Sequence, residues 1–147
     1  MERLRKFLCL SNAERWILIK VALLLAVIAV SKRLLPFRTV RRLLARAADR
    51  PVGRQHADRL SAQRVVWAVE AASRHIPRTK SCLTQALAAQ LMLTRRGYPA
   101  LVHLGVTRGE QGQFQAHAWV EMEGKAVIGR SGLERFTPLT LLKGVGP

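Results

Sequence analysis

Two side chains of this sequence have the types and the placement that nucleophilic catalysis needs. Cys82 follows Ser81, a good helix cap, and therefore begins a predicted helix, where unpaired backbone N–H groups and the helix dipole favour a thiolate. His117 lies in the middle of a predicted strand. A cysteine that opens a helix, followed by a histidine on a downstream strand, is the arrangement that cysteine hydrolases and transglutaminases use. We therefore predict that Cys82 is a nucleophile and that His117 is its base.

Neighbouring residues favour this role, although a structural role for Cys82 is the main alternative. Arg78 and Lys80 add positive charge before the predicted helix, and the Cys82 amide could donate to a tetrahedral intermediate. Free cysteines are among the most buried residue types, so a partner is needed for a functional interpretation. His117 supplies it, because its strand face is polar and the opposite face is apolar. The competing histidines are expected at the surface or in loops: His56, His75 and His103.

Helices are predicted to precede and include the cysteine. The first is capped by Ser11 or Asn12 and ends near Leu35, because Pro36 follows. The remaining predicted helices cover residues 37–48, 57–75 and 82–96, the last of them closing at Gly97. A turn cluster at residues 49–53 is the predicted boundary between an N-terminal helical region, 1–50, and a catalytic region, 51–147, within one compact domain overall.

Beyond Gly97 the apolar period changes to two, which is typical of strands. Residues 100–107 and 114–121 alternate and are joined by a turn at 109–112. The Glu123-Gly124 pair predicts a tight turn into a third strand over residues 125–129. Helices followed by an antiparallel meander define an α+β class.

The high positive charge is compatible with several kinds of binding partner and does not identify one of them. The chain of 147 residues carries a formal net charge of +16, and such a field attracts nucleic acid, anionic lipid or an acidic polypeptide. A non-catalytic nucleic-acid or membrane binder is therefore an alternative function, which salt-dependent binding would reveal. The single tyrosine argues against an aromatic platform for single strands. A solvated helix face explains the charge equally well, since much of it is dispersed over Arg38, Arg41, Arg42 and Arg46.

The two cysteines indicate a reducing compartment, which we take to be the cytoplasm. Cys9 and Cys82 are too few for a disulfide scaffold and lack the spacing of metal ligands. No cofactor and no metal ion are predicted. Cys9 is interpreted as incidental, because it lies in a basic N-terminal segment.

The apolar segment of residues 16–30 raises the question of a membrane anchor. Lys20 interrupts it, and it is shorter than the roughly 18 apolar residues that cross a bilayer. Ser31-Lys32-Arg33 follows where a signal peptide would have a small-residue cleavage site. We expect a helix that is buried in the fold or lies against a partner.

Several blocks of the sequence resemble the lasso peptide maturation proteases, the leader peptidases also called maturation protein B. These are bacterial transglutaminase-like cysteine proteases. The resemblance rests on the blocks at residues 82–88, 95–100 and 114–121, the last reading Phe-Gln-Ala-His-Ala-Trp-Val-Glu. It continues upstream at residues 34–38 and downstream at 127–129 and 136–139, and so covers nearly the whole chain.

The resemblance implies a papain-like fold and an endopeptidase that removes the leader from a ribosomally made precursor. It also implies partners, namely the precursor leader, a separate leader-recognition protein and an ATP-using cyclase that closes the macrolactam ring. The apolar helix and the basic surface would then dock one of these partners. Nucleic acid is not implied as a partner.

One departure from the family concerns the third catalytic group. The family has an aspartate on the strand after the histidine, whereas this chain has Val-Ile-Gly-Arg-Ser at residues 127–131. A two-residue turn at Glu123-Gly124 would place Arg130 opposite His117, and an arginine cannot stabilise an imidazolium. The orienting group is therefore left open among a backbone carbonyl, Ser131 and Glu134. An aspartate introduced at Gly129 is expected to be tolerated at a strand end.

The missing acid also leaves a second chemistry open. A transglutaminase-like acyl transferase, or a scaffold without activity, would keep the same fold.

Overall fold

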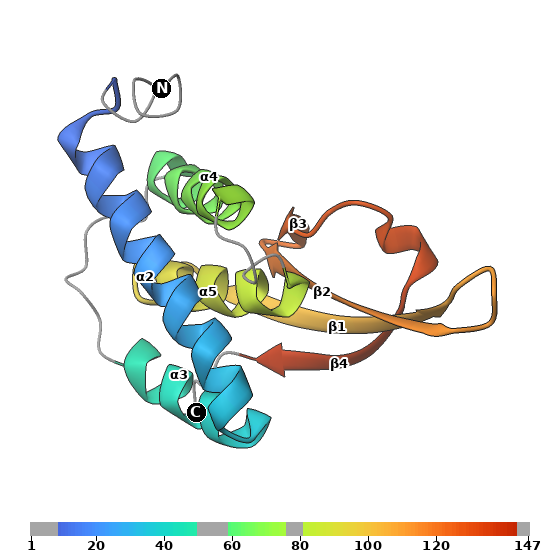
Figure 1. Ribbon diagram of the computed structural model, residues 1–147. Coiled ribbons are helices and arrows are strands. Elements are labelled where there is room, and N and C mark those ends of the chain that lie inside the picture. The colour runs from blue at the N-terminus through green and yellow to red at the C-terminus, as the bar shows by residue number, and fades with distance from the viewer. Residues whose placement is uncertain (1–8, 50–58, 76–80, 144–147) are drawn as a thin grey trace.

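The computed structural model describes residues 9–49, 59–75 and 81–143, with backbone only at 59–60 and 140–143. Its helices come first and its strands follow, which confirms the α+β class (Figure 1). The helices are α2 (Asn12–Leu34), α3 (Phe37–Ala48), α4 (Arg59–His75) and α5 (Cys82–Thr94). The strands are β1 (Ala100–Arg108), β2 (Phe114–Met122), β3 (Lys125–Ile128) and β4 (Thr137–Lys143), with a short 3-10 helix η1 (Leu133–Arg135) before β4.

The ends of α2 follow from local hydrogen bonding and from proline. Ser11 Oγ accepts a hydrogen bond from the Glu14 backbone N–H at 3.3 Å, and the Glu14 carboxylate accepts one from the Ser11 N–H at 2.9 Å. This capping box fixes the start of the helix and lowers the pKa of Glu14. At the other end Leu35 is extended because Pro36 follows it. The predicted limits of α2 are thus confirmed to within a residue, and those of α3 are confirmed.

Helix α5 is the centre of the fold. It contacts α2, α3, α4 and the first three strands, and most of its residues are buried. Its alanines and leucines are strong helix formers, and a helix that is apolar on all sides is stable only inside a protein. It ends at Thr94, two residues before the predicted end, because Gly97 adopts a left-handed conformation with φ 86° and the Tyr98 N–H returns to Leu93 O at 3.1 Å.

The sheet is antiparallel, with the strand order β3-β2-β1-β4. In the long β1–β2 hairpin Gly105 lies opposite His117 and His103 opposite Trp119. The hairpin extends past the helices, as Figure 1 shows. The sequence predicted three strands and missed β4, which follows the loop containing η1 and includes Pro138; this edge strand pairs with β1.

The β2–β3 hairpin has the predicted two-residue turn but a different register beyond it. Glu123 and Gly124 have φ values of 52° and 75°, which are typical of a type I′ turn. Glu121 pairs with Ala126, whereas Val120 pairs with Ile128, so a bulge shifts the ladder by one residue. The prediction that Arg130 lies opposite His117 is therefore wrong. The alternation of apolar and polar residues does not indicate this bulge.

Helix α2 is buried on one face only. Val21, Leu25 and Ile28 pack into the core, against α4 and α5. The opposite face exposes apolar side chains at helical spacing, and these define the outer stripe: Trp16, Ile19, Leu23, Val27, Val30 and Leu34. Within the described residues, no helix has both the length and the apolar character that crossing a bilayer requires. The expectation that this segment is buried in the fold is confirmed for its inner face, and contact of its outer face with a partner stays a prediction.

Candidate active site

Cys82 is the first residue of α5, as the sequence predicts, and its side chain is half-buried against the core. The residue before it, Ser81, has the extended backbone of an N-cap, with φ −60° and ψ 123°. Its hydroxyl makes no capping hydrogen bond to α5. The polar contacts at this turn come from another helix instead.

Lys32 reaches from α2 to the first turn of α5. Its ammonium Nζ donates to Ser81 Oγ and to Thr84 Oγ1, each at 3.1 Å. These two acceptors flank Cys82 in the sequence, and Thr84 is fully buried. Partial burial lowers the pKa of Lys32, while the negative charge of a Cys82 thiolate would raise it, so the two groups lie within electrostatic range of each other. No feature of the sequence indicates this contact, because Lys32 and Ser81 are 49 positions apart.

His117 is held by a backbone carbonyl. Its Nε2 lies 2.8 Å from Gly129 O, and because a carbonyl oxygen can only accept, Nε2 carries the proton and donates it. In the neutral ring Nδ1 then keeps the lone pair that a base needs. Of the three orienting groups left open by the sequence, the structure provides the backbone carbonyl, whereas Ser131 and Glu134 are exposed.

The expectation that an aspartate would be tolerated at Gly129 is wrong. Gly129 has φ 71°, a backbone conformation that residues with a Cβ rarely adopt. A Cβ at this position would lie 2.8 Å from Ala118 O and 3.2 Å from His117 Nε2. The close approach that forms the hydrogen bond to His117 therefore requires glycine.

Aromatic rings surround the imidazole of His117. The centroid of the Phe136 ring lies 5.0 Å away, and the Trp119 ring is stacked at 6.3 Å with an interplanar angle of 21°. Trp119 is 6% exposed. Gly105 leaves room for it, because a Cβ there would meet Trp119 Cζ3 at 2.9 Å. Packing of this kind restricts the rotation of the His117 ring.

The other histidines differ from expectation at one position. His103 was expected at the surface or in a loop, but it is half-buried in β1 and stacks on Trp119 with centroids 5.3 Å apart. Its Nε2 lies 3.3 Å from Glu121 Oε2, at ion-pair distance but outside hydrogen-bond geometry. His75 is exposed at the end of α4, as predicted, and His56 lies outside the described residues.

Cys82 and His117 lie on elements that pack directly together. Helix α5 contacts both β2 and β3, and its N-terminal end lies beside β2 in Figure 1. The β3 ladder reaches only Val120, so the edge of β2 at His117 has no strand partner on that side within the described residues. No hydrogen bond joins the Cys82 thiol to the His117 ring in this part of the chain. Catalytic contacts are often long before substrate binds and shorten in the complex.

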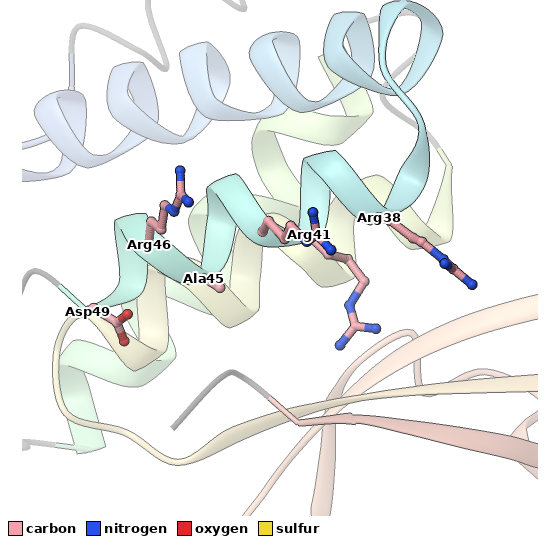
Figure 2. Close-up of a pocket in the computed structure, with 6 residues that line it drawn as sticks. Arg38, Arg41, Ala45, Arg46 and Asp49 are labelled. Atoms are coloured by element: carbon pink, nitrogen blue, oxygen red, sulfur yellow. The ribbon is translucent and has the colours of Figure 1, made fainter. Parts of the chain in front are cut away.

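Two hollows near the helices are lined by residues that the structure describes. A hollow of about 450 Å³ is lined by Glu70, Ser73 and Arg74 of α4 and by Gln85, one turn after Cys82. A second, of about 500 Å³, runs along α3 (Figure 2) and is lined by Ala45, Asp49 and the four arginines dispersed along this helix, namely Arg38, Arg41, Arg42 and Arg46. Neither cysteine nor histidine is present in the lining of the second hollow. Over the described ranges, no three side chains of His, Cys, Asp or Glu lie together as ligands for a metal ion.

Comparison with known families assigns the fold. The chain belongs to the transglutaminase-like superfamily, whose family model matches residues 22–141. The match begins within α2 and ends within β4, so it includes every element described above as part of the candidate site. Neither the curated proteins nor the solved structures gave a match. Membership supports chemistry of the cysteine protease or acyl transferase type in general.

Proposed function

We propose that the protein is a cysteine endopeptidase that removes the leader peptide from a ribosomally made lasso peptide precursor. Cys82 is its nucleophile and His117 its base. The observation that carries the proposal is the hydrogen bond from His117 Nε2 to Gly129 O at 2.8 Å. It gives the ring an orienting acceptor without an aspartate and leaves Nδ1 free to exchange a proton with a thiol.

The reaction uses groups already described. The Cys82 thiol passes its proton to His117 Nδ1, and the thiolate attacks the scissile carbonyl to form a tetrahedral intermediate. The helix N-terminus, including the Cys82 amide, stabilises the oxyanion. The imidazolium returns the proton to the leaving amine as the peptide bond breaks. Water, deprotonated by His117, then hydrolyses the thioester and restores the thiol. During these steps Gly129 O accepts from the charged ring and stabilises it.

A separate leader-recognition protein presents the precursor in this proposal, and a macrolactam-forming cyclase acts on the product. The outer stripe of α2 and the arginines of α3 are surfaces suited to such contacts, because one is apolar and exposed and the other is strongly basic. The neighbouring genes give the first test, since a short precursor, a recognition protein and an asparagine-synthetase-like cyclase are expected beside this gene.

The decisive assay mixes the full chain with that precursor and recognition protein and follows leader release by mass spectrometry. Cys82→Ala and His117→Ala should each abolish release without loss of the fold, whereas Cys9→Ala, which removes the other thiol, should change it little. Cleavage that persists in Cys82→Ala, or an equal loss in Cys9→Ala, contradicts the proposal.

A primary amine added in excess separates the peptidase from an acyl transferase. A hydrolase releases a leader with a free carboxylate, and a transferase attaches the amine to it. Mass spectrometry distinguishes these products, and a predominantly amine-linked product would replace the peptidase by the transferase.

A further inference from the structure

The contact between Lys32 and the first turn of α5 is not explained by capping. The Ser81 side chain is free of the N-cap bond that serine usually makes, and Lys32 occupies its hydroxyl instead. Lys32 also donates to the buried hydroxyl of Thr84. A lysine side chain loses considerable rotamer freedom when it is fixed in this way. This entropic cost favours a function of the contact other than stabilising the start of α5.

The geometry brings a positive charge to Cys82. An ammonium group has three protons, of which two go to the hydroxyls of Ser81 and Thr84, residues on either side of Cys82. The third is available to a thiolate. The helix N-terminus adds its own positive potential at the same place.

We propose that Lys32 is a positioning residue for Cys82, whose ammonium group is anchored by Ser81 and Thr84 and favours the ionised thiol. The proposal rests on the role of Cys82 as the nucleophile. It gives α2 a part in the active site, although α2 lies far from α5 in the sequence.

Arg78 and Lys80 lie outside the described residues, and the other titratable groups described near this turn do not replace Lys32. Glu70 and Arg74 of α4 line a common hollow with Gln85 and carry opposite charges. His117 of β2 is bonded to Gly129 O. The arginines of α3 line their own hollow. Among the described side chains, Lys32 is the cation with hydrogen bonds to both Ser81, which precedes Cys82, and Thr84, two residues after it.

The test measures the ionisation of Cys82 directly. In a Cys9→Ala background Cys82 is the remaining thiol, and its alkylation by iodoacetamide is followed as a function of pH. Lys32→Gln keeps a donor for the two hydroxyls but removes the charge, and Lys32→Arg keeps the charge. Lys20→Gln is the matched control, because Lys20 is an exposed lysine of the same helix.

Because a neighbouring cation lowers a thiol pKa, its removal leaves less thiolate at neutral pH. Lys32→Gln should therefore slow alkylation at neutral pH by about tenfold, while the rate at high pH stays the same. Lys32→Arg should restore most of the rate, and Lys20→Gln should leave the profile unchanged. The proposal is overturned if the Lys32→Gln profile coincides with that of the parent, or if Lys20→Gln shifts it equally. If Lys32→Gln unfolds, Ser81→Ala decides: release of the ammonium group from one of its two anchors should slow alkylation at neutral pH, and an unchanged profile overturns the proposal.

This measurement needs no peptidase substrate, so it separates the two proposals. A shift in the thiol pKa in a chain that cleaves no precursor would support the role of Lys32 and overturn the peptidase. Precursor cleavage together with an unshifted thiol pKa would do the reverse.

Discussion

The surroundings of Cys82 and those of His117 hold their side chains by different physical means. Around Cys82 the fixed contacts are polar and come from another helix, through Lys32 and the hydroxyls of Ser81 and Thr84. Around His117 they are two aromatic rings and one backbone carbonyl. The first region acts on the charge of a side chain, and the second acts on the orientation and tautomer of a ring.

Because of this difference, mutations in the two regions should have different effects on stability and on reactivity. Aromatic packing is worth several kcal/mol, because large apolar surfaces are buried. A half-exposed polar bridge contributes far less to folding, since water competes for the same hydrogen bonds. Changes near His117 should therefore be detected as losses of stability, and changes near Cys82 mainly as altered reactivity.

The largest expected effect is that of Trp119→Ala. Trp119 is 6% exposed and stacks on both His103 and His117, so truncation leaves a cavity and should destabilise the fold by about 3–5 kcal/mol. Trp16→Ala removes the same side chain from the outer stripe of α2, where it is 63% exposed, and should cost less than about 0.5 kcal/mol. Urea unfolding measures both. Equal losses would show that the His117 region is not held by its aromatic packing.

An intermediate effect is expected for Gly129→Ala. The φ of 71° and the 2.8 Å approach to Ala118 O together should cost about 2–3 kcal/mol and displace the carbonyl that orients His117. Gly124→Ala is the control, because its φ is 75° but a Cβ there meets nothing within 4 Å, so only the conformational cost of about 1 kcal/mol remains. Thermal unfolding compares the two variants. If Gly124→Ala is as damaging as Gly129→Ala, the close approach at Gly129 contributes nothing.

The smallest effect should come from the bridge beside Cys82. Thr84→Val keeps the shape of a buried side chain but removes the acceptor of a charged donor, which should cost about 1–2 kcal/mol. Ser81→Ala removes the half-exposed acceptor and no capping bond, so a loss of roughly 0.5 kcal/mol is expected. Denaturant midpoints resolve this order. A larger loss from Ser81→Ala would mean that Ser81, rather than Thr84, is the main anchor of Lys32.

The parts of the fold that depend on local chemistry could be predicted from the sequence. The ends of α2 follow from the Ser11 cap and Pro36, and the hairpin turn follows from Glu123-Gly124. The start of α5 at Cys82 is likewise predicted by Ser81, the residue before it.

The features that were missed depend on contacts between distant residues or on backbone detail. Lys32 looks like an ordinary basic residue at the end of an apolar helix until the fold brings it to Ser81. The bulge between Val120 and Glu121 changes no residue type, yet it removes Arg130 from the position opposite His117, whose ring is bonded to the Gly129 carbonyl instead. His103 has no sequence feature that distinguishes its buried position beside Trp119 from a surface one.

The acceptor at Gly129 has a consequence for how the site can be found experimentally. A carboxylate in that position would be lost in any alanine scan, whereas a main-chain oxygen is present whatever residue stands there. A scan of this chain should therefore identify a two-residue centre, and Gly129 would be recorded only as a position sensitive to side-chain size. The oxygen also has no acid dissociation of its own in the physiological range, so no third ionisation should enter the pH profile of catalysis. Replacement of the amide by an ester at the bond after Gly129, by chemical synthesis or semisynthesis, would make the Gly129 carbonyl a weaker hydrogen-bond acceptor without changing any side chain.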